Sequence, residues 1–168
     1  MHTHFLISWT ALTEGRYWTL ITSVFSHKSA LHLLLNMLAL GSFGPIMEST
    51  LGRNAFIKFY LIAGIISSLS HAMVSNLILH EPNLPALGAS GAISGLILLF
   101  SLTYPKQKIL VFGLIPVPAI FGALAFVGLD IWGLVAQAEG GGLPIGHGAH
   151  LGGALTGLAY YLYQKKTA

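Results

Sequence analysis

Long apolar runs interrupted by few charges are the feature that most constrains this chain. A helix that crosses a bilayer needs about 20 mostly apolar residues. Only 8% of the 168 residues are charged, against about 25% in a soluble domain, so the chain cannot cover a water-exposed surface. The sequence therefore predicts an all-α, polytopic membrane protein. The expected spans are residues 31–47, 55–79, 89–104, 109–136 and 148–163.

Two of these spans depart from the usual length. The third is short, so we expect it to begin below the membrane surface. The fourth is long and carries Pro116 and Pro118. Because proline removes a backbone donor, we expect a kink or a break there.

The distribution of Lys and Arg predicts an orientation, because cytoplasmic loops collect these residues. It puts the N-terminus outside, the C-terminus in the cytoplasm and Ser90 near the outer face. The net charge of +3 is small and scattered, which does not indicate a nucleic-acid partner. The two groups of cations are Arg53, Lys58, Lys106, Lys108, Lys165 and Lys166 on the cytoplasmic side, and Arg16 and Lys28 on the other.

Polar residues inside the apolar runs are the candidates for function, because ionisable groups in a bilayer are costly. His32 and Asn36 lie at the outer end of the first span. Ser90 begins the third span from outside, and His150 begins the fifth. Four polar residues from three helices are therefore expected at one depth.

Ser90 and His150 have the residue types of a nucleophile and its base. A serine hydroxyl is a weak nucleophile until a neighbouring base takes its proton. Small residues four apart let helix backbones approach closely in lipid, which would bring the two side chains together. Spacing alone leaves two interpretations open, catalysis or tight packing. The small residues are Gly91 and Gly95 on the third span, and Gly153 and Gly157 on the fifth.

His32 and Asn36 share a helix face, because they are four residues apart. Both can donate hydrogen bonds, and acyl transfer needs donors aimed at the oxygen that becomes negative. The alternative is a polar clasp that holds two spans together. In combination with Ser90 and His150, we favour an oxyanion hole.

The remaining polar residues have simpler interpretations. His71, near the outer end of the second span, is expected to snorkel or to pack between helices. Asp130 is the only aspartate, and an ordinary hydrogen bond or a wet environment would suffice for it. His147 is a rival base for Ser90, but we expect it in the loop before the fifth span.

Other protease chemistries fit the sequence poorly. An aspartyl mechanism needs two carboxylates in one site, and a cysteine nucleophile is excluded because the chain has no cysteine. Zinc proteases typically carry H-E-x-x-H on a helix, which does not occur here. A metal site is conceivable but has no supporting motif; its ligands would be His32, His71, His147 and His150.

Four segments in order resemble the rhomboid family of intramembrane serine proteases. They are "GRYWTLITSVFSH", "HLLLN", "LGASGA" and "HGAHLGGALTG", between Gly15 and Gly157. "NMLALGSFG" and "HLGGALTG" are similar to the branch that includes mitochondrial rhomboids. The resemblance implies one rhomboid peptidase domain over residues 1–168. Residues 1–30 would form an extramembrane loop and residues 31–163 a transmembrane bundle.

The resemblance also implies the roles of individual residues. Ser90 would be the nucleophile and His150 the base and acid, as a dyad without an aspartate. His32, Asn36 and the amide of Ser90 would form the oxyanion hole, with Gly88 shaping the loop. The substrates would be single-span membrane proteins, cut in or near the transmembrane segment. Neither a metal nor an organic cofactor is expected.

Two departures from the family pattern affect these expectations. The family core has six spans, so we expect the chain to be N-terminally truncated by one helix. Ser94 replaces an aromatic residue that stacks on the catalytic histidine in several members, so His150 is expected to be held less rigidly or by another group.

The glycine-rich loop 137–146 would act as a flexible cap.

Two other functional classes stay open on the sequence. One is a non-catalytic rhomboid-like protein that binds membrane helices. The other is a small transporter subunit, which inverted repeats would favour, although none is visible. A bacterial inner membrane is the first expectation for location, with the mitochondrial inner membrane as the alternative.

Overall fold

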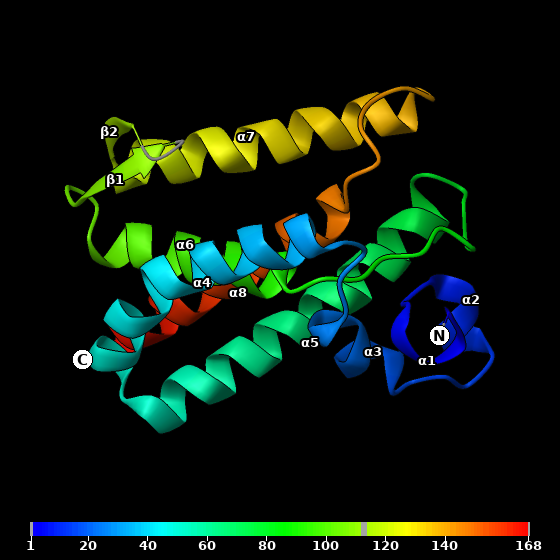
Figure 1. Cartoon of the computed structure of the whole chain (residues 1–168), viewed down its shortest axis with the longest axis horizontal. Coiled ribbons are helices and arrows are strands. Elements are labelled where there is room, and N and C mark those ends of the chain that lie inside the picture. Colours follow the sequence, from blue (N-terminus) through cyan, green and yellow to red (C-terminus); the bar gives the residue numbers. More distant parts are fainter. Residues whose placement is uncertain (1, 112–113, 168) are drawn as a thin grey trace.

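Five helices form the body of the molecule in the computed structural model, which describes residues 2–111 and 114–167 (Figure 1). Three of them, α4, α5 and α7, are long and apolar enough to cross a membrane. The third predicted span is an apolar helix of only 14 residues. The helical membrane class is confirmed, although in the described part of the chain only three helices are both long enough and apolar enough to span a membrane. The helices are α4 (Ala30–Leu51), α5 (Arg53–Leu77), α6 (Ser90–Thr103), α7 (Ala119–Ala138) and α8 (His147–Thr167).

The fourth predicted span is wrong at its beginning. A two-stranded antiparallel hairpin of β1 (Lys108–Val111) and β2 (Ile115–Pro118) precedes α7. Pro118 has φ −56° and ψ 134°, an extended conformation after which the helix starts. Proline has no backbone amide hydrogen to donate to a neighbouring strand, so within sheets it is found mainly on edge strands. The break expected at the prolines is therefore confirmed, but the helix lies entirely after them.

The N-terminal region packs against the helical body through four short helices. Ile7 pairs with Ala86 in an antiparallel bridge, with backbone hydrogen bonds of 3.0 and 2.8 Å. Ile7, Leu12 and Ala72 of α5 form a buried apolar cluster. This region therefore anchors the segment that leads into α6. The helices are α1 (His2–Phe5), α2 (Trp9–Thr13), α3 (Thr19–Thr22) and η1 (Ser23–Phe25).

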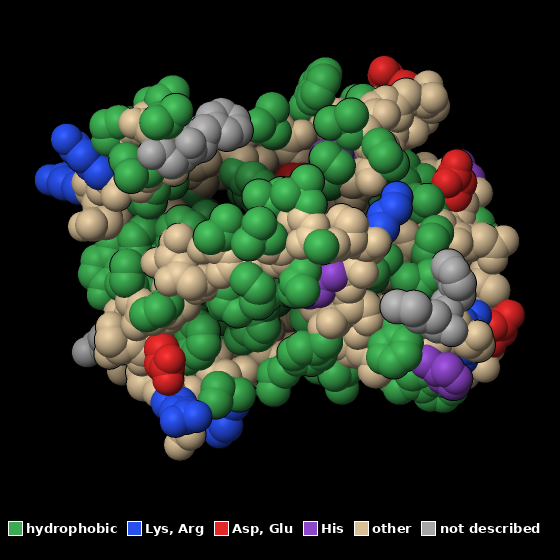
Figure 2. Space-filling view, viewed as in Figure 1, with side chains coloured by type: hydrophobic (Ala, Val, Ile, Leu, Met, Phe, Trp, Pro, Cys, Tyr) green, Lys and Arg blue, Asp and Glu red, His purple; other side chains and the backbone are tan. Residues whose placement is uncertain are grey.

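The main core surrounds α6, whose Leu96 and Leu99 are fully buried. In contrast, α4, α5 and α7 expose large apolar side chains, including Leu35 at 57% and Trp132 at 68%. Figure 2 shows apolar side chains over much of the visible surface. Extensive exposed apolar surface is unusual in a soluble monomer and suits contact with lipid chains.

The two ends of the molecule differ in charge. The α4–α5 turn, the hairpin and the C-terminus lie at one end, and the N-terminus and the α5–α6 connection lie at the other (Figure 1). Arg53 begins α5, Lys108 begins β1, and Lys165 is in the last turn of α8. Cations from all three predicted cytoplasmic segments therefore share one end. The orientation of the chain in a membrane stays a prediction.

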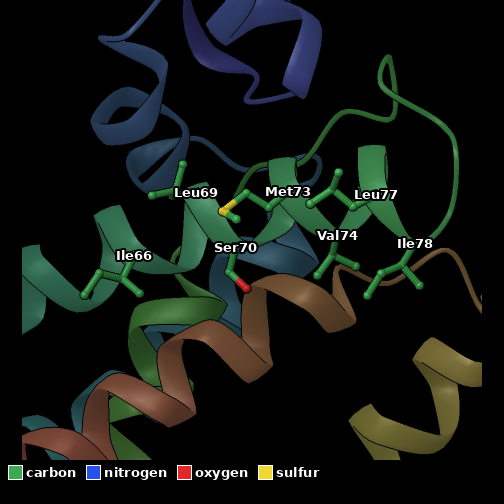
Figure 3. Close-up of a pocket in the computed structure, with 7 residues that line it drawn as sticks. All are labelled: Ile66, Leu69, Ser70, Met73, Val74, Leu77 and Ile78. Carbon is green, nitrogen blue, oxygen red and sulfur yellow. The ribbon is translucent and has the colours of Figure 1, made fainter.

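An apolar groove runs along an exposed face of α5 (Figure 3). Ser70 lies in it and donates a hydrogen bond of 2.8 Å to the carbonyl oxygen of Gly148 in α8. None of its lining residues is a predicted site residue. The lining is Ile66, Leu69, Ser70, Met73, Val74, Leu77 and Ile78.

Candidate active site

Glycines bring α6 and α8 into backbone contact. A Cβ atom on Gly153 would lie 1.8 Å from the carbonyl oxygen of Gly91. A Cβ on Gly95 would lie 2.6 Å from the oxygen of Gly153, and one on Gly157 would lie 2.3 Å from the oxygen of Gly95. Any side chain at these positions would force the helices apart. All four glycines identified from the sequence therefore lie in this interface.

Helix α5 approaches the same pair of helices closely, which sequence reasoning missed. A Cβ on Gly91 would lie 1.6 Å from the Oγ of Ser67, and one on Gly152 would lie 2.3 Å from the Cβ of Ser70. Gly148 is similarly close to the side chain of Val74 in α5. The signal was present, because Gly148 and Gly152 are also four residues apart.

Ser90 and His150 lie at the beginnings of α6 and α8. The Oγ of Ser90 is 2.9 Å from the Nε2 of His150, within hydrogen-bond distance. Both residues are half-buried. The structure thus brings together the two residues that the sequence pointed to as nucleophile and base.

Asp130 of α7 completes a chain of hydrogen bonds. Its Oδ1 is 2.9 Å from the Nδ1 of His150, and the residue is 5% exposed. An ionised carboxylate at Asp130 can only accept, an arrangement that assigns the proton of His150 to Nδ1 and leaves Nε2 to accept one from Ser90. The expected dyad without an aspartate is therefore wrong. For Asp130 itself, the expected hydrogen bond is confirmed and the wet environment is wrong, because the residue is buried.

His147 contacts the same carboxylate oxygen. It begins α8 rather than lying in the preceding loop, and its Nδ1 is 2.7 Å from the Oδ1 of Asp130. Its buried Nε2 faces α7, where a Cβ on Gly133 would lie 2.3 Å away. Among the described residues this Nε2 has no hydrogen-bond partner. The expectation of a loop residue competing for Ser90 is wrong, because His147 points at Asp130.

An aromatic ring does lie against His150, but from a different helix than in the family pattern. The ring of Phe126 in α7 stacks on the imidazole, with centroids 5.6 Å apart and planes 29° apart. Ser94 instead donates a 2.7 Å hydrogen bond to the carbonyl oxygen of Ser90 within α6. His150 is therefore oriented by another group, as the absence of an aromatic residue at position 94 implied. Phe126 and Asp130 are four residues apart, which was the overlooked signal.

His32 lies beside the loop that leads into Ser90. Gly88 in that loop has φ +121°, and a Cβ there would lie 2.9 Å from the Nε2 of His32. Asn36 is buried one turn further along α4 and donates a 2.9 Å hydrogen bond to the carbonyl oxygen of His32. His32 and Gly88 are thus adjacent, and Asn36 lies behind His32 on the same helix face.

A second imidazole supports His32 from outside the helices. The ring of His27 is edge-on to that of His32, with centroids 5.2 Å apart. Burial lowers the pKa of His27, and the nearby His32 lowers it further, against an opposing hydrogen bond with the backbone of Phe25. Sequence reasoning did not single out this residue, because it precedes the first span.

His71 is a structural residue. It is 4% exposed, and its Nε2 lies 3.1 Å from the carbonyl oxygen of Leu84. This contact ties α5 to the segment before α6. Packing is confirmed for His71, and snorkelling to the interface is wrong.

The loop after α7 is tied to the end of that helix. Gln137 donates hydrogen bonds of 2.7 and 2.8 Å to the carbonyl oxygens of Leu143 and Ile145. These bonds fold the segment back over α7 before α8 begins. The role of this loop as a cap stays a prediction.

Comparisons with known proteins give the family of the chain. The model of the rhomboid domain matches residues 14–166. Rhomboid protein 1, mitochondrial, of Saccharomyces cerevisiae is 39% identical over 152 residues, covering 88% of this chain and 42% of that protein. RHOMBOID-like protein 12, mitochondrial, of Arabidopsis thaliana is 32% identical over 166 residues, covering 92% and 48%.

Presenilin-associated rhomboid-like protein A, mitochondrial, of Danio rerio is 36% identical over 156 residues, covering 90% of this chain and 38% of that protein. The chain thus spans less than half the length of these relatives. The family match extends over nearly the whole helical body. It includes all four residues joined by hydrogen bonds at the site, Ser90, Asp130, His147 and His150. The chain belongs to the rhomboid family.

Proposed function

We propose that the chain is an intramembrane serine endopeptidase that cuts single-span membrane proteins in or near their transmembrane segments. The observation that carries this proposal is the hydrogen-bonded series Ser90–His150–Asp130, with both links at 2.9 Å. Nucleophile, base and orienting carboxylate in this order are the general signature of an activated serine.

Each of these residues has a defined task in the proposed reaction. Ser90 Oγ attacks the scissile carbonyl carbon while His150 Nε2 takes the hydroxyl proton. Asp130 stabilises the imidazolium that forms and holds its tautomer, without itself taking the proton. His150 then protonates the leaving amine, and water hydrolyses the acyl-enzyme by the same route.

The beginning of α6 supplies donors for the oxyanion. Its first amides have no intrahelical partner, and Ala89 at the N-cap makes no side-chain hydrogen bond to them. His32 lies over Gly88, two residues before Ser90. We assign the oxyanion hole to the amide of Ser90 together with His32 and Asn36, with Gly88 shaping the loop before Ser90.

The location of the chain is also a proposal. The relatives described above are all named as mitochondrial. They give no support to the bacterial inner membrane and favour a mitochondrial location, for which we propose the inner membrane. The proposed substrates, wherever the chain is located, are membrane helices that unwind easily. A helical peptide bond is shielded by its own hydrogen bonds until the helix opens.

The test is cleavage of a fluorogenic single-span substrate by the purified chain in detergent, beside Ser90→Ala and His150→Ala. Ser42→Ala is the matched control, because Ser42 is an exposed serine on α4. We expect cleavage by the parent and the control, and at least a thousandfold loss in the two site variants. A serine-reactive phosphonate should label Ser90 alone. A folded parent that neither cuts several substrates nor reacts with the phosphonate would support the non-catalytic, helix-binding alternative.

A further inference from the structure

The second histidine on Asp130 is a feature that the proposed reaction does not use. A Ser–His–Asp series needs one imidazole on the carboxylate, and His150 provides it. His147 nevertheless presents its Nδ1 to the same Oδ1, at 2.7 Å against 2.9 Å for His150. The side chains of His147 and Asp130 are only 8% and 6% exposed. Two imidazoles and one carboxylate therefore converge from α7 and α8.

This convergence has the composition and spacing of a metal site. One ligand atom from each residue lies within 4.8 Å of the other two, and the two imidazole rings are nearly perpendicular, at 85°. Zn²⁺ binds His nitrogen and Asp oxygen at about 2.0–2.2 Å in a tetrahedral arrangement, which places its ligand atoms about 3.4 Å apart. The present distances of 2.7 and 2.9 Å thus need to expand by only about 0.5–0.7 Å.

A cation in this position would stop the proposed reaction through His150. A neutral imidazole that coordinates a metal through Nδ1 carries its proton on Nε2. That Nε2 lies 2.9 Å from the Oγ of Ser90, so it would donate to the hydroxyl instead of accepting its proton. The proton merely moves from one ring nitrogen to the other, and Ser90 loses its base.

The donor set also decides which cations fit. Two imidazoles and one carboxylate suit Zn²⁺ and Cu²⁺, whereas Mg²⁺ and Ca²⁺ prefer oxygen ligands. Access is through His150, whose side chain is 12% exposed and which must meet the substrate. A water molecule would fill the fourth position of a tetrahedral ion.

We propose that Asp130, His147 and His150 form a binding site for a divalent transition-metal ion, best matched by Zn²⁺, that reversibly inhibits the chain. The inhibition rests on the proposed protease function, but the binding does not. His147 is the residue that makes the site, because without it only two protein ligands remain.

Binding is tested on the untagged full-length Ser90→Ala chain in detergent, which keeps all three ligands and cannot cut. Co²⁺ is the first probe, because a tetrahedral Co²⁺ site gives visible absorption, and Zn²⁺ should displace it. We expect one site per chain and about a hundredfold weaker binding after an added His147→Gln. His4→Gln with His80→Asn is the matched control, since these histidines lie on the surface, and it should bind as the parent does.

Inhibition is tested on the active chain with the fluorogenic substrate. Zn²⁺ should inhibit it, EDTA should restore the rate, and Mg²⁺ should have no effect. In His147→Gln, the Zn²⁺ concentration for half inhibition should rise about a hundredfold relative to that variant's own metal-free rate.

Loss of binding in the surface-histidine control, or unchanged binding in His147→Gln, would overturn the metal site. Binding by Ser90→Ala beside a parent that never cleaves would uphold the site and contradict the protease proposal instead. Active parent enzyme that binds Zn²⁺ at this site without inhibition would overturn the inhibitory role.

Discussion

The α6–α8 interface and helix α7 support the same candidate site in different ways. The interface joins two backbones through glycine, and most residues of α6 are buried, with Leu96 and Leu99 fully enclosed. Helix α7 lies along one side of the bundle (Figure 1) and exposes Leu124 at 58% and Trp132 at 68%. The first region sets the Ser90–His150 distance, and the second orients His150.

A single stripe of α7 faces the other helices. Its members recur at intervals of three and four residues, which is the period of one helix face. Three of them lie at the histidines of α8, and the others pack near the hairpin end. One narrow stripe thus carries all of the contribution of α7 to the site. The stripe is Ala119, Ala123, Phe126, Asp130 and Gly133.

The largest effect is expected from a side chain in the α6–α8 interface. Gly153→Ala places a Cβ 1.8 Å from the carbonyl oxygen of Gly91. Because backbone cannot yield as a flexible side chain does, the free energy of unfolding should fall by about 3 kcal/mol or more. Denaturation in detergent measures it. Gly128→Ala on α7 is the control, because nothing lies near its Cβ position. It should be neutral or stabilising by up to about 1 kcal/mol.

Asp130→Asn tests whether α7 contributes to the chemistry. An amide can donate to the Nδ1 of His150 and stabilise the wrong tautomer, so kcat should fall by about 10²- to 10⁴-fold with little change in KM. Phosphonate labelling of Ser90 should slow in parallel. Parent-like cleavage would mean that Ser90 and His150 act without the carboxylate. The α6–α8 interface would then support the reaction without the Asp130 of α7.

Gly133→Ala tests the contact between α7 and α8. The added methyl group would lie 2.3 Å from the Nε2 of His147, so it must push α7 away or displace the ring. We expect a stability loss of about 1–3 kcal/mol and a lower cleavage rate. A double-mutant cycle with His147→Ala measures the coupling, because the smaller side chain removes the clash. Additive effects would show that the contact is not what places Asp130.

Phe126→Leu should have a smaller effect on catalysis. Stacked aromatic pairs contribute about 0.5–1.5 kcal/mol beyond the area that they bury, so the cleavage rate should fall by roughly twofold to tenfold. Phe121→Leu is the matched control on α7, because Phe121 is 63% exposed and should cleave like the parent. Equal losses in both variants would indicate a general effect on the helix.

The smallest effect concerns pH and His27. Burial and the neighbouring His32 lower the pKa of His27 below its ordinary value of 6.5, so the folded state favours the neutral ring. The stability that this residue contributes is therefore present above pH 6.5 and is lost as the pH falls from there through the folded pKa. Unfolding measured between pH 7.5 and 5 should show a shallower decline in His27→Gln. An unchanged slope would remove His27 from the acid response.

Local sequence patterns were sufficient for much of the fold and half of the site. Apolar runs indicated the helices, and the prolines indicated the break before α7. Glycines four residues apart predicted the contact that places Ser90 beside His150. The apolar runs and the prolines determine structure within a few residues along the chain. The glycine spacing marks helix contacts so close that no other residue fits. They can therefore be read without knowing the arrangement of the helices.

Tertiary structure alone decided how α7 contributes. Apart from Asp130, α7 is apolar on nearly every side, so its pattern does not fix its rotation beyond keeping Asp130 out of lipid, and the face with Phe126 and Asp130 could have met any neighbouring helix. The rotation is set by packing against α6 and α8, including the fit of His147 over Gly133. The hairpin and the folded N-terminal region likewise depend on partners far along the chain, such as Ala86 for Ile7. The sequence by itself determined the five main helices, apart from the beginning of α7, and the Ser90–His150 pair, and packing between distant segments decided what holds that pair in place.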